Sequence, residues 1–337
     1  MASRRLSAPS IANPALATAQ AAAEFRSHAL RLPAQATGLR FDQALARALP
    51  QYSRALLKAW IESGAVQVDG RPLRAKDKVL GGEQVRIEAQ LAAHTAAAAE
   101  AIALAVAFQD PSLFIINKPP GLVVHPGAGN PRHTLQNALL GLDPQLALLP
   151  RAGLVHRLDK DTSGLLVVAR TPEAHAALTA AMASRRIGRE YLALCTGVMT
   201  AGGTVTEPIG RHRSQRTRMA VRADGRPAVT RYRIAKRFRA HTLVRVELET
   251  GRTHQIRVHL AHIGFPVVGD PLYAGLRRVP AGCTPALSAE LQAFPRQALH
   301  AARLRLTHPV TGRELTWEAP LPEDIQRLLA ALEAEGS

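Results

Sequence analysis

A short polar segment between two apolar runs is the feature that most constrains how this chain folds. Leu154-Val155 precede the segment and Gly164 to Ala169 follow it, and both runs are typical of strands. The residues between them, Asp159 to Ser163, favour a turn. The pattern therefore predicts that Asp159 lies among cations at a strand end, on a loop held by rigid neighbours. On local sequence alone, Asp159 could equally cap this turn or pair with Arg157 or Lys160.

The net charge indicates the kind of partner. The 337 residues include 43 Lys and Arg against 26 Asp and Glu, which gives a formal net charge of +17. Such an excess attracts polyanions, either nucleic acid or an anionic membrane surface. The sequence has no run of about eighteen uncharged apolar residues, so a membrane span is not expected. Nucleic acid is the favoured partner.

The two cysteines point to a reducing compartment. Cys195 and Cys283 lie in unrelated contexts, without the spacing of a zinc site or a disulfide framework. We therefore expect a cytoplasmic protein. Residues 1–36 are rich in Ala, Ser and Arg, and we interpret them as a disordered basic tail; a transit peptide has a similar composition.

Residues 37–88 are expected to form a small module of two helices and a hairpin. Apolar residues at helical spacing begin at Phe41, and Ser53 could cap a second helix that ends at Gly64. An alternating stretch then turns at Asp69-Gly70, which is a hairpin signal. Arg54 and Lys58 lie four residues apart on the second helix, where they could follow an RNA backbone or simply face solvent.

Residues 89–101 are expected to be a linker, and residues 102–337 a second domain. The second domain alternates short β-branched runs with helical patterns irregularly, which favours an α+β fold on a mixed sheet. The expected strands are 113–117, 122–125, 167–169, 191–196, 228–234, 243–248 and 304–307. The expected helices are 133–142, 172–183, 253–263 and 322–334.

Ordered motifs carry a resemblance to known families. The 37–88 module is similar to the S4 RNA-binding domain through Ser53-Arg54 and the stretch from Gly64 to Gly70. The second domain resembles the RluA family of RNA pseudouridine synthases. Its motifs, in family order, are Asn117 to Pro119, His156 to Leu165, Arg189 to Tyr191, and Gly251 to Arg257. The resemblance implies a catalytic domain on a mixed, mainly antiparallel sheet.

The resemblance also implies the reaction and the residues that perform it. The chain would isomerise uridine to pseudouridine in 23S ribosomal RNA, at the stem-loop called helix 69, with Asp159 as the catalytic carboxylate. Arg252 would be its cationic partner, Arg157 would fill the space left by the flipped base, and Tyr191 would lie against the uracil. The residues expected to contact RNA are Arg54, Lys58, His156 and Arg257. A further phosphate contact for Arg252 and a core position for Tyr191 are the alternatives.

The chemistry of this isomerisation needs no cofactor, because it involves no redox change and no outside atom. A carboxylate could attack C1′ or remove the C2′ proton, and the sequence does not choose between these routes. His254, His259 and His262 do not suit a metal site, since Arg252 and Arg257 would repel the ion. We expect a monomer that acts on the ribosomal RNA or on a precursor of the large subunit. A non-catalytic assembly factor and a base-excising glycosidase are the rival functions.

Overall fold

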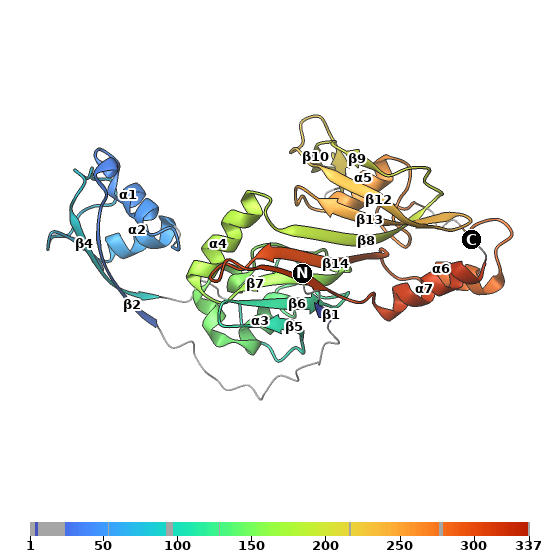
Figure 1. Cartoon of the computed structure of the whole chain (residues 1–337), viewed down its shortest axis with the longest axis horizontal. Coiled ribbons are helices and arrows are strands. Elements are labelled where there is room, and N and C mark those ends of the chain that lie inside the picture. The colour runs from blue at the N-terminus through green and yellow to red at the C-terminus, as the bar shows by residue number, and fades with distance from the viewer. Residues whose placement is uncertain are drawn as a thin grey trace.

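The computed structural model describes residues 4–5, 24–52, 54–91, 97–127, 129–215, 217–275 and 279–335. A small module lies at one end of the molecule, and a larger domain built on one long sheet forms the rest (Figure 1). Ser53, with its predicted capping role, lies outside the described residues.

The small module packs two helices against a three-stranded antiparallel sheet of order β2-β4-β3. Its elements are β2 (Glu24–Arg31), η1 (Ala34–Ala36), α1 (Phe41–Ala48), α2 (Arg54–Glu62), β3 (Val66–Val68) and β4 (Gln84–Leu91). The two predicted helices are confirmed, and Phe41, Leu45 and Leu57 are fully buried between them and the sheet. Asp69 and Gly70 both have positive φ, 47° and 78°, as the predicted tight turn requires.

The module begins earlier than predicted. Strand β2 pairs with β4 along its whole length, so residues 24–31 are part of the sheet and the expected tail over residues 1–36 is wrong there. The reason is that β2 is an edge strand whose residues are exposed or half-buried, so it lacks the apolar alternation of a buried strand. Arg4–Arg5 (β1) also form a short strand, parallel to β15.

The large domain is built on a mixed, mainly antiparallel sheet, as predicted. Its strand order is β5-β6-β7-β14-β8-β13-β12-β9, and β15 pairs with β14. Within this path only β7 and β14 run parallel. The strands of the sheet are β5 (Ala105–Gln109), β6 (Leu113–Lys118), β7 (Ser163–Ala169), β8 (Gly188–Thr196), β9 (Gly203–Val205), β12 (Thr230–Arg237), β13 (His241–Leu248), β14 (Leu299–Thr307) and β15 (Glu314–Glu318). A separate hairpin consists of β10 (Ile209–Arg211) and β11 (Met219–Val221).

Helices lie around this sheet at the predicted places, with one addition. They are α3 (Leu135–Leu142), α4 (Pro172–Ala183), α5 (Gln255–His262), α6 (Pro285–Ala293) and α7 (Glu323–Ala334), with short turns η2 (Pro144–Leu148) and η3 (Pro150–Gly153). Helix α6 was not predicted. The expected strand at 122–125 is only an isolated bridge from Val123 to Thr134. None of the described helices is long and apolar enough to cross a membrane.

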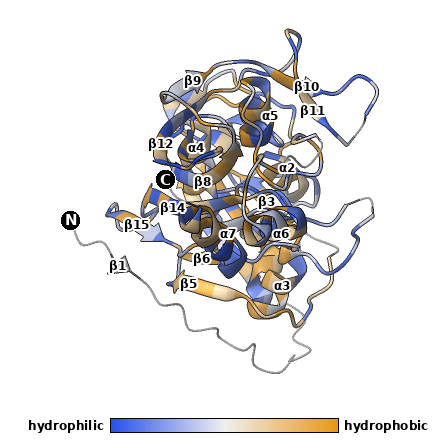
Figure 2. Ribbon diagram, turned by 90° about the vertical axis from the view of Figure 1, so that its right-hand side faces the viewer, coloured by the Kyte–Doolittle hydropathy of each residue, from blue (hydrophilic) through white to orange (hydrophobic). Residues whose placement is uncertain are grey.

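The two bodies are connected by packing as well as by the chain. Leu148 of η2 is buried in the apolar core of the small module. The described end of the linker is fixed to α3, because Asn137 donates to the Ala98 carbonyl at 2.7 Å and accepts from the Glu100 amide at 3.0 Å. Figure 2 shows α3 as a mainly hydrophobic ribbon, consistent with its buried position.

Buried histidines make the fold sensitive to mild acid. Burial lowers the pKa of His300 to about 4, while its Nδ1 lies 2.9 Å from the Ser163 hydroxyl. A histidine with a folded-state pKa below its unfolded value near 6.5 opposes protonation in the native state. Stability is therefore lost as the pH falls below about 6.5. Carboxylates with lowered pKa values lose their contribution only at more acid pH.

We predict that His300→Asn makes the free energy of unfolding less dependent on pH. The free energy of unfolding is measured with urea at pH 7.5 and at pH 5.5. Between these two pH values it should fall by about 1.4 kcal/mol less in the variant than in the parent protein. Exposed His262, changed to Gln, is the control and should keep the parental dependence. Equal pH dependence in His300→Asn and the parent would contradict the prediction.

Candidate active site

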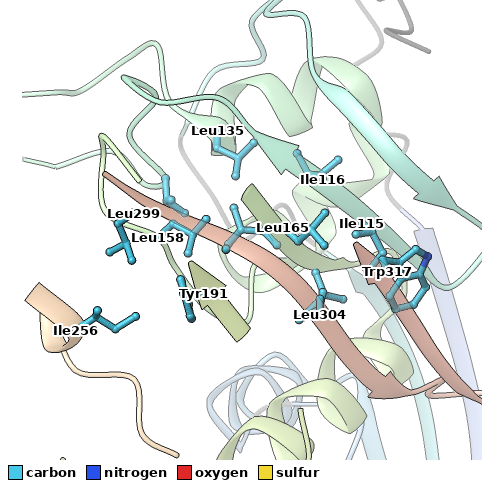
Figure 3. Packing of buried hydrophobic residues seen from close by; sticks show 14 of the residues in the cluster. Ile115, Ile116, Leu135, Leu158, Leu165, Tyr191, Ile256, Leu299, Leu304 and Trp317 are labelled. Atoms are coloured by element: carbon cyan, nitrogen blue, oxygen red, sulfur yellow. The ribbon is translucent and has the colours of Figure 1, made fainter. Parts of the chain in front are cut away.

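The loop that carries Asp159 is anchored in the core of the sheet domain. Leu158 has only 4% of its surface exposed, and it lies among Leu299, Leu165 and Tyr191 (Figure 3). Asp159 follows directly and retains 17% side-chain exposure. The neighbouring apolar residue therefore fixes the loop while the carboxylate remains accessible. Asp159 thus lies on a loop held by rigid neighbours, as predicted, but the run before the loop forms only an isolated bridge from Leu154 to Val168, and the strand is β7, which follows the loop.

Polar side chains hold the rest of the loop through its backbone and hydroxyls. The fully buried Lys118 ammonium donates to the carbonyls of Lys160 at 2.8 Å, Pro119 at 2.7 Å and Leu122 at 3.0 Å. Burial lowers the pKa of Lys118 to about 7, and its three carbonyl acceptors favour the charged form. Beyond Lys160, Arg296 donates to the Asp161 carbonyl at 3.0 Å, and the Gln297 amide contacts the Thr162 hydroxyl at 3.1 Å.

The cationic partner of Asp159 is Arg257. Its Nη1 donates to Asp159 Oδ2 at 3.1 Å, while its Nε and Nη2 donate to the two oxygens of Asp270 at 2.6 and 2.8 Å. Asp270 is fully buried, and Arg257 is 4% exposed. Burial alone would lower the pKa of Arg257, but the two carboxylates outweigh it and raise the pKa. The guanidinium thus stays charged between two anions.

The predicted partnership of Arg252 with Asp159 is therefore wrong. Arg252 donates from Nε to the Pro227 carbonyl at 3.1 Å, and it lines the same cavity. The chain turns at His254, which has a φ of 57°, so α5 begins at Gln255, two residues after the expected helix start. The cause is this left-handed residue, which reorients the chain between Arg252 and the helix.

Arg257, a predicted RNA contact, has a role within the protein instead. Its guanidinium is 4% exposed, and three of its N–H groups donate to Asp159 and Asp270.

A cavity of about 830 Å³ opens in front of Asp159, which is within the usual size range of ligand sites. Arg157 lies at this cavity with an exposed side chain, and Tyr191 of β8 lies on its wall with 4% exposure. Burial raises the pKa of Tyr191, the charge of Arg189 opposes the rise, and Asp159 adds to it. The phenol is therefore neutral at physiological pH. The structure brings Asp159, Arg157, Tyr191 and Arg252 to one cavity.

His156 also lines this cavity, but it is held inward. Its Nε2 accepts from the Val167 amide at 3.1 Å, which fixes the proton on Nδ1 in the neutral ring. Burial, followed by the charge of Arg189, lowers its pKa to about 3. His156 is thus a neutral hydrogen-bond donor.

The histidines of α5 have structural partners. His259 is buried between the Thr230 hydroxyl and the Glu207 carbonyl, each at 2.8 Å. His254 contacts the Tyr273 hydroxyl at 2.8 Å, and that oxygen also accepts from the Met219 amide of β11. Among the described residues, no group of three or more His, Cys, Asp or Glu side chains could hold a metal ion.

The two candidate RNA contacts of the small module lie on α2, and neither of them lines this cavity. Arg54 donates to Asp42 at 2.6 Å, and Arg40 pairs with the same carboxylate at 3.1 Å. Asp42 is buried, so Arg54 has a structural role that the sequence did not reveal, although half of its side chain is exposed. Lys58 is half-exposed and lies 3.4 Å from Glu62.

Sequence reasoning missed three residues of this site. No role was predicted for Asp270, Lys118 or Arg189. For Arg189 a signal existed, because residues two apart on a strand share a face and Tyr191 was already a candidate. No local pattern identified Asp270, because only the folded chain brings it next to Arg257.

Comparisons with known proteins agree with this geometry. A sequence profile described as RNA pseudouridylate synthase matches residues 112–262, and an S4 domain profile matches residues 39–85. The chain is 53% identical over 306 residues to "Ribosomal large subunit pseudouridine synthase D" of Xanthomonas campestris pv. campestris, covering 91% of this chain and 92% of the relative. The protein of the same name from Escherichia coli K12 is 53% identical over 299 residues, covering 88% and 92%.

A solved structure shows the same likeness. "Human RNA Pseudouridylate Synthase Domain Containing 4" superposes with a TM-score of 0.53 at 27% identity, covering 68% of this chain and 92% of that one. The comparisons and the anchored Asp159 cavity lead to one conclusion: the chain belongs to the RNA pseudouridylate synthase family.

Proposed function

We propose that this protein isomerises uridine to pseudouridine in 23S ribosomal RNA, at the helix 69 stem-loop, with Asp159 as the catalytic residue. The observation that carries the proposal is the accessible Asp159 carboxylate, paired with a buried guanidinium in a cavity large enough for a nucleoside. The other carboxylate of the lining, Glu249, is paired instead with Arg185 and Arg231, whose side chains are exposed. The relatives named as large-subunit synthases support ribosomal RNA as the substrate. The helix 69 assignment rests on the closeness of the sequence motifs to one member of the family.

The reaction breaks the N1–C1′ bond, rotates the uracil, joins C5 to C1′ and releases the C5 proton. Asp159 would act either as the nucleophile at C1′ or as the base at C2′, and both roles require the ionised carboxylate. Arg257 supplies the positive charge next to Oδ2. No hydrogen bond from a described residue reaches Oδ1, which leaves this oxygen for the substrate.

The target base must leave its stack to reach this cavity, at a cost of about a few kcal/mol. Arg157 is exposed at the cavity and is proposed to fill the vacated space in the RNA. Tyr191 would lie against the uracil and assist removal of the C5 proton. Since its pKa is raised, it would pass a proton on rather than act as a phenolate.

We further propose that the enzyme acts as a monomer. A ribosomal RNA substrate in turn supports a place in the cytoplasm. The rival functions give different products. A binding factor would release no tritium from C5-labelled RNA, and a glycosidase would release free uracil, which mass spectrometry detects.

We predict that Asp159→Asn abolishes tritium release but leaves RNA affinity within a few-fold of the parent, because the backbone anchors of the loop remain. Asp161→Asn is the matched control, since it removes a carboxylate from the same loop. The control should retain activity. Measurable turnover by Asp159→Asn would exclude Asp159 from the chemical step.

We predict that Asp270→Asn lowers kcat by at least about tenfold, with KM little changed. The amide cannot accept both guanidinium bonds, so Arg257 would shift relative to Asp159, and displacements of about 1 Å can cost up to about 100-fold. Arg257→Lys should show the same kinetic pattern, since an ammonium cannot bridge two carboxylates. Single-turnover rates and thermal unfolding would be measured together. A normal rate in both variants would refute a role for this ion pair.

We predict that Lys58→Gln weakens RNA binding and reduces the salt dependence of log K by about 0.7 to 0.9, as expected for one lost phosphate contact. Lys58→Arg, which keeps the charge, is the control and should bind normally. Arg54→Glu with Lys58→Glu should have a larger effect, but it also removes a partner of buried Asp42. An unchanged salt slope in Lys58→Gln would mean that this residue only faces solvent.

A further inference from the structure

The arginines of the catalytic cavity differ in whether the protein already uses their charge. They are Arg151, Arg157, Arg185, Arg189, Arg252 and Arg257. Arg257 pairs with two carboxylates, Arg185 pairs with Glu249 at 3.3 Å, and Arg252 donates to a carbonyl. Within the described residues, Arg151, Arg157 and Arg189 form no ion pair.

Arg189 stands out among these three because it is not at the surface. Arg151 and Arg157 are exposed, whereas Arg189 is half-buried on β8 and its Nε is buried without a hydrogen-bond partner in the described structure. The nearby acidic residues form ion pairs with other arginines. Glu249 pairs with Arg185 and Arg231, and Glu190 pairs with Arg245 at 2.8 Å. Arg189 therefore brings an uncompensated charge to the cavity wall.

His156 contributes a second unsatisfied donor at the same wall. Its Nδ1 carries the proton, is buried, and has no hydrogen-bond partner among the described residues. The charge of Arg189 contributes to the lowered pKa of His156, so the two groups lie close enough to interact. Unsatisfied buried donors are rare in proteins and need an explanation. Here two of them line one cavity.

The backbone at Gly251 leaves room for the guanidinium at the cavity wall. A Cβ built on Gly251 would lie 3.0 Å from Arg189 Nη1, so a side chain at this position would displace the arginine. Gly251, the first residue of the Gly251 to Arg257 motif, thus lets the chain pass directly beside Arg189.

We propose that Arg189 and His156 form an anion subsite that binds a phosphate group next to the target nucleotide. A guanidinium with a neutral N–H donor suits the non-bridging oxygens of a phosphodiester, since charge and hydrogen bonds are both satisfied. A uracil carbonyl would accept a hydrogen bond but leave the charge uncompensated. The inference rests on the proposed function, because the flipped nucleotide brings its own backbone into the cavity. Both residues bind substrate and take no part in bond breaking.

Methylphosphonate substitution of single RNA linkages tests this subsite. Binding is measured in the Asp159→Asn background, so that turnover does not interfere. With Arg189 present, one neutral linkage flanking the target uridine should weaken binding by about 10- to 100-fold. Arg189→Gln should weaken binding of unmodified RNA by a similar factor and show no further loss at that linkage. Exposed Arg313, changed to Gln, is the charge-matched control and should keep the parental sensitivity.

The alternatives give distinct results. If Arg189→Gln stays as sensitive as the parent to every flanking methylphosphonate, Arg189 does not bind a phosphate and the inference fails. In His156→Gln, the methylphosphonate at the same linkage should reduce RNA affinity less than it does in the parent. An affinity loss as large as in the parent would mean that His156 does not belong to the subsite. If Arg189→Gln does not fold, the same binding measurements are made with Arg189→Lys and His156→Gln. Absence of tritium release from helix 69 RNA by the parent enzyme would instead overturn the proposed substrate, independently of the phosphate map.

Discussion

The site depends on one buried guanidinium that two carboxylates share. Arg257 is almost completely buried, which would be costly without partners. Fully buried Asp270 takes two of its donors and leaves Nη1 for Asp159. Asp270 thus sets the direction of the guanidinium, while Asp159 is the exposed end of the triad. Removing Arg257 would leave two neighbouring carboxylates without compensation, and removing Asp270 would free the two donors that set the direction of the guanidinium, so the three residues act as one unit.

The scaffold around this unit is as important as the charges. Lys118 from β6, and Arg296 and Gln297 from the segment before β14, fix successive residues of the Asp159 loop. These elements are far apart in sequence but lie on either side of β7 in the sheet. The Asp159 carboxylate is therefore placed by the order of the strands, which gives it a rigid support.

Local patterns in the sequence predicted the loop and strand of the site better than its side-chain contacts. Asp159 and Tyr191 lie within short motifs, and their loop and strand could be predicted from local patterns. The partner of Asp159 could not, because Arg252 and Arg257 differ in direction only through the left-handed His254, which no periodicity reveals. Strand β2 was missed because an edge strand lacks apolar alternation. Asp270 became visible only when the fold placed it against Arg257.

The positive charges of the cavity offset the repulsion between an RNA phosphate and the Asp159 carboxylate. An RNA nucleotide brings a phosphate toward a site that must contain an ionised carboxylate, and the two anions repel each other. Arg257 offsets the charge of Asp159 from within the protein, whereas Arg151, Arg157 and Arg189 remain unpaired within the described residues. Separate cations for each anion would reduce the repulsion between the phosphate and Asp159 as the nucleotide approaches. The net charge of +17 attracts RNA at long range, but this local division of charge decides whether a nucleotide can enter.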